Sequence, residues 1–359
     1  MKHTTTTILT ALLLPSVAAA GDHCPTASGC QDSAAQHLTH TDHMGHDHSV
    51  ATPTGVMGGH AHDAGEVMFS YRYMFMNMDG LRSGSSSATT ADVTAAGYMN
   101  SPADMQMEMH MIGAMYGLTD RITLMAMTNY LSNTMDMNMA SGMPMSMESE
   151  GLGDTSLGAI HKTYQAANTS ILTGLSVIAP TGSTDETMTM MMMSPMGMPM
   201  SMTMAQPYGM QLGSGTWALK PSVTYLGQSD KLSWGAQLSS IIYLGTNDNG
   251  YRLGNKVDAT AWTAYKLTDD LSLTARVAGS SWGDINGAHD GYSMMAPTMT
   301  TTLNTANSGG DKVDAYIGAS YTLGLLKTTV EYGQTLWQDL DGIQLGYDWT
   351  LNLGASISF

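Results

Sequence analysis

The last fifteen residues of the chain, 345-LGYDWTLNLGASISF-359, place an apolar side chain at every second position. The apolar set is Leu345, Tyr347, Trp349, Leu351, Leu353, Ala355, Ile357 and Phe359. Because side chains of a strand alternate between its two faces, one face meets an apolar medium and the other a polar one. The run exceeds the roughly 10 residues with which a tilted strand crosses a bilayer. It therefore predicts a membrane-spanning strand, and its length disfavours the alternative, an edge strand of a soluble sandwich.

Similar segments recur through the chain and are joined by connections that are alternately short and long. Short turns at one end and long loops at the other are typical of outer-membrane barrels. The fold expected is all-β, a transmembrane antiparallel up-and-down β-barrel of about 12 strands, with both termini in the periplasm. Five tyrosines near the turns and further aromatic residues near the loops predict two aromatic girdles. The predicted strands cover 66–78, 104–117, 121–133, 151–164, 169–180, 214–226, 231–245, 256–267, 271–284, 312–323, 326–338 and 345–359.

The beginning of the chain has the pattern of a secretory signal peptide. Ile8 to Leu14 form an apolar run, and Ala18-Ala19-Ala20 offer a cleavage site. We therefore expect a signal peptide at 1–20, a flexible His-rich periplasmic segment at 21–64 and the barrel at 65–359. The expected location is the outer membrane of a Gram-negative bacterium, with membrane lipid and the barrel-assembly machinery as partners. Cys24 and Cys30 fit either one disulfide or a metal site.

The charge balance limits the classes of partner. The net charge is −17 with only 13 Lys and Arg, so we expect no nucleic acid partner. Charged residues within strands are expected to face the lumen, since a Lys or Arg facing hydrocarbon costs about 2–4 kcal/mol. Two interpretations are open: these charges line a hydrated passage, or they pair with one another and plug the barrel. The predicted lumen residues are Arg72, Glu108, His110, Arg121, Lys220, Asp258, Arg276, Asp314, Glu331 and Asp348.

Histidines are concentrated before the first predicted strand. Eight of the twelve lie between His23 and His62, and 43-HMGHDH-48 packs three imidazoles, a thioether and a carboxylate together. Imidazole is a ready ligand for copper, zinc or nickel, although a solvated linker is the alternative. The candidate metal ligands of this segment are His37, His40, His43, Met44, His46, His48, His60 and His62.

Methionine, at 35 residues, is concentrated in two long connections. Thioethers are soft ligands that select Cu(I) and, by the same softness, Ag(I). The alternative is that methionine supplies flexible apolar bulk, and the methionines of strand 104–117 are expected to face lipid in that way. The candidate ligands are Met135, Met137, Met139, Met143, Met145, Met147, Met190, Met192, Met196, Met198, Met200 and Met202.

Several short motifs resemble outer-membrane transporters related to the phenol-degradation meta-pathway group. They are 55-GVMGGH-60, 70-SYRYM-74, 149-SEGLGD-154, 247-NDNGYRLG-254, 282-WGDI-285 and 338-QDLDG-342. The resemblance covers nearly everything after residue 54 and implies a barrel transporter without indicating its substrate. Motifs of dedicated outer-membrane copper-resistance barrels are absent.

These patterns predict an outer-membrane channel for small solutes or ions. Carboxylates near the mouth (Glu148, Glu150, Asp185 and Glu186) favour cations. The His-rich and Met-rich segments are expected to bind copper or silver, although no cofactor is required. The alternative is a metal-sequestering protein whose barrel is plugged. No catalytic spacing is recognisable, so we expect no enzyme activity.

Overall fold

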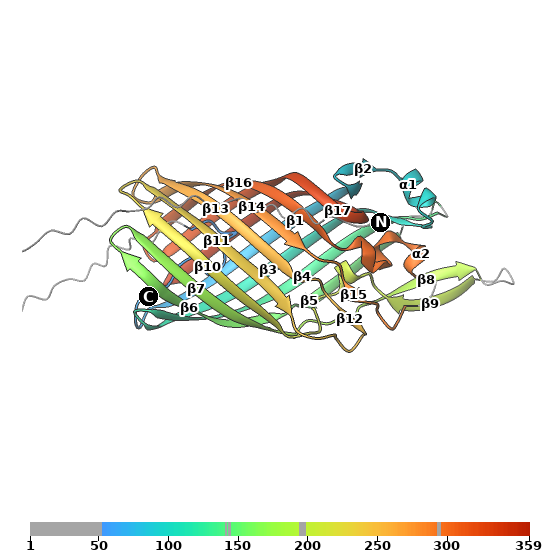
Figure 1. Ribbon diagram of the computed structural model, residues 1–359, viewed down its shortest axis with the longest axis horizontal. Helices are drawn as coiled ribbons and strands as arrows, with labels where there is room; N and C mark the ends of the chain where they lie inside the picture. The colour runs from blue at the N-terminus through green and yellow to red at the C-terminus, as the bar shows by residue number, and fades with distance from the viewer. Residues whose placement is uncertain (1–51, 141, 143–144, 194–198, 293–295) are drawn as a thin grey trace, which may run out of the picture. The chain divides into compact units, whose positions relative to one another are not determined.

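The computed structural model describes residues 52–140, 142, 145–193, 199–292 and 296–359. Most of them lie in one antiparallel sheet that closes on itself, because its last strand pairs with its first (Figure 1). Within these described residues, eleven strands make up the closed ring. They are β1 (Val67–Gly84), β3 (Ser101–Thr119), β4 (Ile122–Asn138), β6 (Thr155–Ala166), β7 (Thr169–Ala179), β10 (Ala218–Gln228), β11 (Leu232–Tyr243), β13 (Lys256–Lys266), β14 (Leu271–Trp282), β16 (Gly310–Leu323) and β17 (Leu326–Ser358).

The predicted all-β antiparallel barrel is confirmed, and the difference from about twelve strands lies at the C-terminus. The two segments expected at 326–338 and 345–359 are one strand of 33 residues, β17. Its first part, from Leu326 to Leu340, pairs with β16, and its second part pairs with β1 from Leu340 to Ser358. Gly342, with φ of +67°, lies between the two parts. One strand therefore runs along the barrel twice.

The outer surface of the barrel is apolar and carries a ring of tyrosines near the short turns. The five tyrosines predicted for this girdle are 41–53% exposed. They alternate along their strands with inward residues, as period two requires. Within the described part of the chain, no helix is both long and apolar enough to cross a membrane. The girdle consists of Tyr116, Tyr164, Tyr225, Tyr265 and Tyr321.

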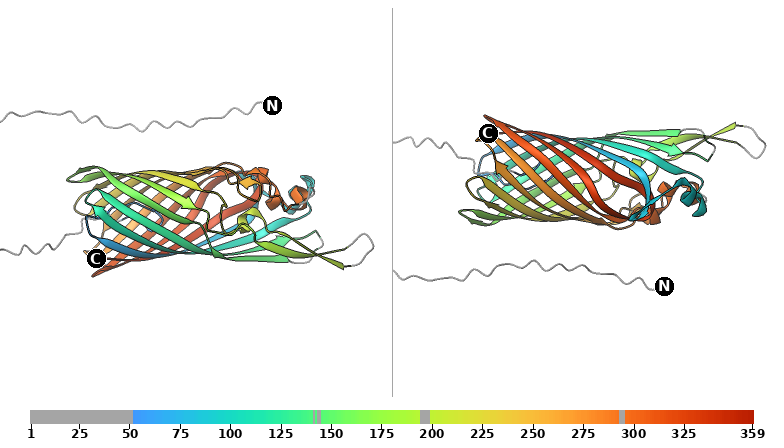
Figure 2. Two further views of the ribbon diagram at one scale, coloured as in Figure 1. Left: turned by 90° about the horizontal axis from the view of Figure 1, so that it is seen from below. Right: turned by 90° about the horizontal axis from the view of Figure 1, so that it is seen from above.

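The two ends of the barrel differ, as the alternating connections predicted. At one end, here called the turn end, strands are joined by connections of a few residues, and Val67 pairs with Phe359 there. At the other, the loop end, the connections contain further elements (Figure 2). They are β2 (Ser86–Ala88), α1 (Thr90–Ala95), β5 (Met145–Leu152), β8 (Thr187–Met193), β9 (Pro199–Ala205), η1 (Tyr208–Met210), β12 (Tyr251–Arg252), β15 (Asn286–Gly287), α2 (Ala296–Met299), η2 (Thr301–Leu303) and η3 (Thr305–Asn307).

Two large apolar clusters are buried in the described part of the chain. One lies toward the turn end and consists of Val56, Met68, Met115, Ile160, Leu172, Leu226 and Trp262. Toward the loop end lies a set that we call the methionine cluster, whose buried members include six methionines. These are Met78, Met105, Met135, Met137, Met147 and Met210.

The methionines of β3 face inward, which corrects the prediction that they face lipid. Met105 is 3% exposed, whereas Ile112 at the opposite parity is 62% exposed. The same alternation places Glu108 and His110 on the outer face, and not in the lumen as predicted. There Glu108 accepts a hydrogen bond from Tyr73, and His110 is bonded to a neighbouring tyrosine hydroxyl. The aromatic and branched side chains decide which face of the strand points outward, because methionine is tolerated on either face.

The alternation of the C-terminal strand is interrupted by a β-bulge. Asn77 of β1 pairs with Trp349 and Met78 pairs with Tyr347, so Asp348 has no partner of its own in this register. Such an extra residue reverses the parity of the strand beyond it. Leu345 is consequently 8% exposed and belongs to the methionine cluster, although the sequence predicted it on the lipid face.

Candidate functional site: the interior of the barrel

Residues 52–64, here called the plug segment, run through the interior of the barrel. Val56 is buried among the side chains of the turn-end cluster. The carbonyl of Met57 accepts a hydrogen bond from Gln237 of β11, at 2.9 Å. Thr54 bonds to Thr329 of β17. The sequence predicted a flexible periplasmic segment up to residue 64, and the structure instead places its last part inside the barrel.

The middle of the plug segment rests on a buried ion pair. The Arg276 guanidinium donates two hydrogen bonds of 2.8 Å to the carboxylate of Glu331. Their side chains are 6% and 1% exposed, and the Tyr316 ring lies 3.6 Å from the guanidinium carbon. The same carboxylate accepts a hydrogen bond from the backbone of Gly55, at 3.1 Å. The plug segment therefore supplies a further hydrogen-bond donor to the carboxylate of this ion pair.

Glycine at position 55 allows this close approach. A Cβ added to Gly55 would collide with the Arg276 guanidinium and lie 2.7 Å from a Glu331 carboxylate oxygen. Under 3.0 Å such a contact forces a displacement. Any other residue would push either the plug or the ion pair away.

A second polar group lies toward the loop end. Asp314, 4% exposed, forms an ion pair of 2.9 Å with Lys312. It also accepts hydrogen bonds from Tyr316 at 3.1 Å and Thr335 at 2.8 Å. The Lys312 ammonium lies 4.4 Å from the centre of the Tyr347 ring. The carboxylate is thus neutralised inside the barrel and not left to attract solvent.

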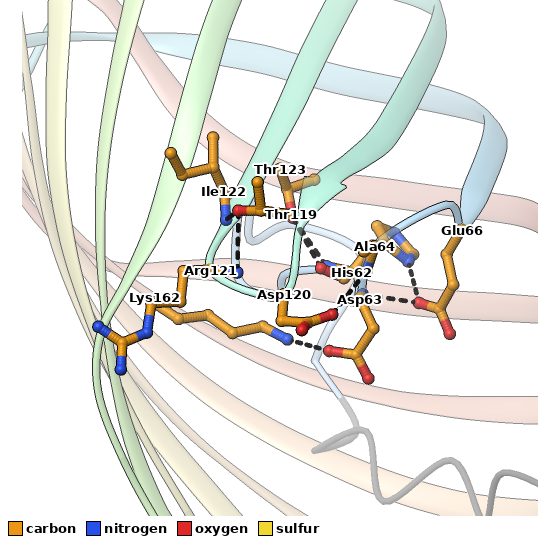
Figure 3. A network of polar contacts seen from close by, with 10 residues as sticks. All are labelled: His62, Asp63, Ala64, Glu66, Thr119, Asp120, Arg121, Ile122, Thr123 and Lys162. Atoms are coloured by element: carbon orange, nitrogen blue, oxygen red, sulfur yellow. Dashed lines mark hydrogen bonds and ion pairs between the residues drawn. The ribbon is translucent and has the colours of Figure 1, made fainter.

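At the turn end, the plug segment is fastened to the β3–β4 and β6 region by a set of contacts that we call the latch (Figure 3). Its contacts join His62 to Thr123, Asp63 to Lys162 and Ala64 to Asp120. The Asp63 side chain is 68% exposed, so the ion pair to Lys162 is open to water. A contact of this kind contributes little free energy and can be released easily.

The loops at the opposite end form a packed cap. Four rings contact one another in a closed circuit, with centroid separations between 4.9 and 5.7 Å: Tyr208, Tyr251, His289 and Tyr292. Burial raises the pKa of Tyr251 to about 12. A tyrosine hydroxyl is hard to ionise where water is excluded. Tyr208, Tyr251 and His289 are all buried, so the packed rings leave little access for water.

The predicted lumen residues divide into three groups. Arg276, Asp314 and Glu331 are buried inside, and Arg72, Lys220 and Asp258 lie on inward positions of their strands. Lys256 forms an ion pair of 3.0 Å with Asp258. Arg121 lies exposed in the turn between β3 and β4, while Asp348 lies at the bulge and binds the Gln334 amide. Glu108 and His110 face outward, as described above.

Sequence reasoning missed the plug contacts and the aromatic partners of the ions. Lys312 sits at an inward position of β16 and Tyr316 shares its face, so strand parity could have found both. Gln237 and Thr123, which hold the plug segment, carry no signal because polar inward residues are common in any barrel.

The structure brings together only part of the predicted metal ligands. Met135, Met137, Met139, Met145 and Met147 are gathered in or against the methionine cluster. The rings of His60 and His62 contact each other at 5.1 Å, within the plug segment. Met190, Met192, Met200 and Met202 belong to the β8–β9 hairpin. The remaining ones lie outside the described residues: His37, His40, His43, Met44, His46, His48, Met143, Met196 and Met198.

Comparison with known proteins supports the architecture. An outer membrane channel from Pseudomonas putida F1 is similar at a TM-score of 0.60 and 15% identity, over 85% of this chain and 99% of that one. The toluene transporter TodX of Pseudomonas putida gives 0.41 and 11%, over 82% and 89%. A FadL homologue of Pseudomonas aeruginosa gives 0.39 and 10%, over 81% and 89%. No protein-family model and no curated protein matches the chain. The first likeness shows a shared fold, and the other two are too weak to add to it.

Proposed function

We propose that this protein is an outer-membrane channel for small solutes or ions, in which the plug segment controls passage. The main support for this proposal is the content of the barrel. The closed barrel has an apolar outer surface, and its interior contains charged residues and the plug segment. The apolar girdle suits a lipid bilayer. Charged residues on the inner face of the barrel suit the passage of polar solutes.

The plug segment has the features of a removable element. It is not a strand of the ring, and several of its backbone hydrogen bonds go to side chains of the wall, namely those of Gln237, Thr123 and Glu331. These contacts are individually modest, because each exchanges for water when the plug withdraws. Passage therefore requires the plug to shift and the loop cap to open.

We further propose that the passage favours cations and that the Met-rich loop end binds copper or silver. The net charge of −17 and the exposed carboxylates Glu148 and Glu150 on β5 support the first part. The thioethers gathered at the loop end support the second. The signal peptide, the periplasmic termini and the assembly machinery remain predictions of the sequence.

A second candidate is a metal-sequestering membrane protein with a permanently closed barrel. The buried methionine cluster and the plug segment inside the barrel favour it. The two candidates differ in permeability. Vesicles containing the refolded protein are expected to admit small sugars or salts and swell, at a rate above that of empty vesicles. Impermeable vesicles with correctly folded protein would reject the channel and leave the second candidate.

A further inference from the structure

A small cavity at the loop end is surrounded mainly by thioethers. Its volume is about 20 Å³. Met137, Met139, Met145 and Met147 line it from the β4–β5 hairpin. Met188 and Met204 line it from the β8–β9 hairpin, and Met299 does so from α2. Three segments far apart in the sequence thus contribute sulfur to one space.

Strand register explains the convergence. On the β4–β5 hairpin, Met135 pairs with Met147 and Met137 pairs with Met145. Met188 is directly opposite Met204 on the β8–β9 hairpin. Side chains of directly opposed residues lie about 4.5–5.5 Å apart at Cβ, close enough to act on one ion. Backbone pairing therefore brings the side chains of each pair together, and the flexible methionine side chains can turn their sulfurs toward one ion.

The polar groups that line the cavity are already engaged. The Asn100 amide donates to the carbonyl of Met299 at 3.1 Å and accepts from the backbone of Ala140 at 2.9 Å. The Thr300 hydroxyl is bonded to Thr302 at 3.2 Å. A buried water needs two to four polar partners, which the described lining does not offer. A soft monovalent cation needs thioether sulfur, which the lining offers in excess.

Three carboxylates lie on neighbouring strands, and one of these strands, β4, also lines the cavity. Asp79, Asp104 and Asp136 are cross-strand neighbours in one row. Asp136 lies between two methionines of the cluster, Met135 and Met137. Like charges directly opposite one another repel and are destabilising, and a nearby cation would reduce this repulsion. The row thus creates a negative potential beside an uncharged cavity.

We infer that this cavity is a binding site for one Cu(I) or Ag(I) ion, held by methionine sulfur alone. The inference rests on the soft-metal part of the proposed function and assigns it to one place in the fold. The ion joins the two hairpins to α2, so that its binding holds these parts of the loop end together.

The test is retention of Ag(I) by the full chain in detergent and chloride-free buffer. After gel filtration, bound silver is counted by mass spectrometry for three proteins. They are the wild type, a cavity variant with Met147→Leu, Met188→Leu and Met204→Leu, and a control with Met68→Leu, Met115→Leu and Met125→Leu. Leucine preserves apolar volume without a soft ligand. The control removes as many thioethers from the turn-end cluster.

The wild type and the control are expected to retain one ion more than the cavity variant, or to bind the tightest ion at least about tenfold more strongly. X-ray absorption of the Cu(I)-loaded wild type is expected to show a sulfur-only shell for that ion. Equal retention by all three proteins, an equal loss in the control, or nitrogen neighbours around that ion would overturn the inference. Conductance is measured separately on metal-free protein, so a failed metal site and a failed channel give different results.

Discussion

Arg276 and Glu331 face each other inside the barrel as a bidentate ion pair of 2.8 Å, and the Glu331 carboxylate also holds the backbone of Gly55. One carboxylate thus connects β14, β17 and the plug segment. Partly removing such a pair leaves a charge that water cannot reach, and this is more costly than never having the pair. Through this hydrogen bond, the plug segment is expected to affect the stability of the barrel as well as its permeability.

Glu331→Gln is expected to lower the free energy of unfolding by about 3 kcal/mol, because Arg276 then remains charged and buried without a counter-ion. Urea unfolding in lipid vesicles, followed by gel mobility, measures the change. Glu150→Gln, at an exposed position, serves as the control and is expected to stay within about 0.5 kcal/mol of wild type. The double replacement Arg276→Met with Glu331→Leu should recover most of the loss. A single Glu331→Gln variant as stable as wild type would contradict a dry ion pair.

Gly55→Val is expected to displace the plug segment, since a side chain there collides with the ion pair. Hydrogen exchange of the backbone at 54–62 should accelerate by at least about tenfold, because the plug's hydrogen bonds open more often. Gly209→Ala is the matched control, as an added Cβ at Gly209 meets no atom within 4 Å. Unchanged protection at 54–62 in Gly55→Val would show that the plug tolerates the larger residue.

Glu148→Gln combined with Glu150→Gln is expected to reduce the preference for cations. Both side chains are exposed on β5 at the loop end. Their potential extends about 8–10 Å at physiological ionic strength, so the effect should shrink at high salt. The reversal potential in a potassium chloride gradient measures it. An unaltered reversal potential would assign selectivity to charges deeper in the lumen.

Met105→Ala is expected to cost about 2–5 kcal/mol of unfolding free energy, because Met105 is 3% exposed within the methionine cluster. Met105→Leu should cost less than about 1.5 kcal/mol. Thermal or urea unfolding of the metal-free proteins compares the two. Met105 does not line the methionine-lined cavity proposed to bind Ag(I). The Met105→Leu variant should therefore retain as much silver as the wild type. A small effect of alanine would mean that the cluster is loosely packed.

The barrel could be predicted from the sequence because period two survives along most strands. Alternation placed some strand ends within two residues, as with the predicted 271–284 against Leu271–Trp282, whereas β1 continues to Gly84, beyond the predicted end at 78. Alternation did not predict the lipid-facing side correctly where apolar side chains occupy both faces of a strand. On β3, methionine at odd positions and Ile112 at an even position compete, and only strand pairing resolves which face meets lipid.

The interior was less predictable, because it depends on contacts that are distant in sequence. Gly55 and Glu331 are 276 positions apart, and nothing local to either indicates the other. The bulge at Asp348 likewise requires knowledge of the pairing with β1. The Met-rich connections led to the soft-metal proposal, but only the folded loops bring Met188, Met204 and Met299 to one cavity.

Single-channel recording in a planar bilayer tests the central claim, that the plug segment controls a passage through this barrel. Wild type and Gly55→Val are compared at equal protein insertion, with Gly209→Ala as control. The account predicts discrete ohmic steps in all three proteins, with a higher open probability or a larger step in Gly55→Val alone. Silence of correctly folded Gly55→Val, together with displaced plug residues in hydrogen exchange, would contradict it and leave a closed, metal-binding barrel.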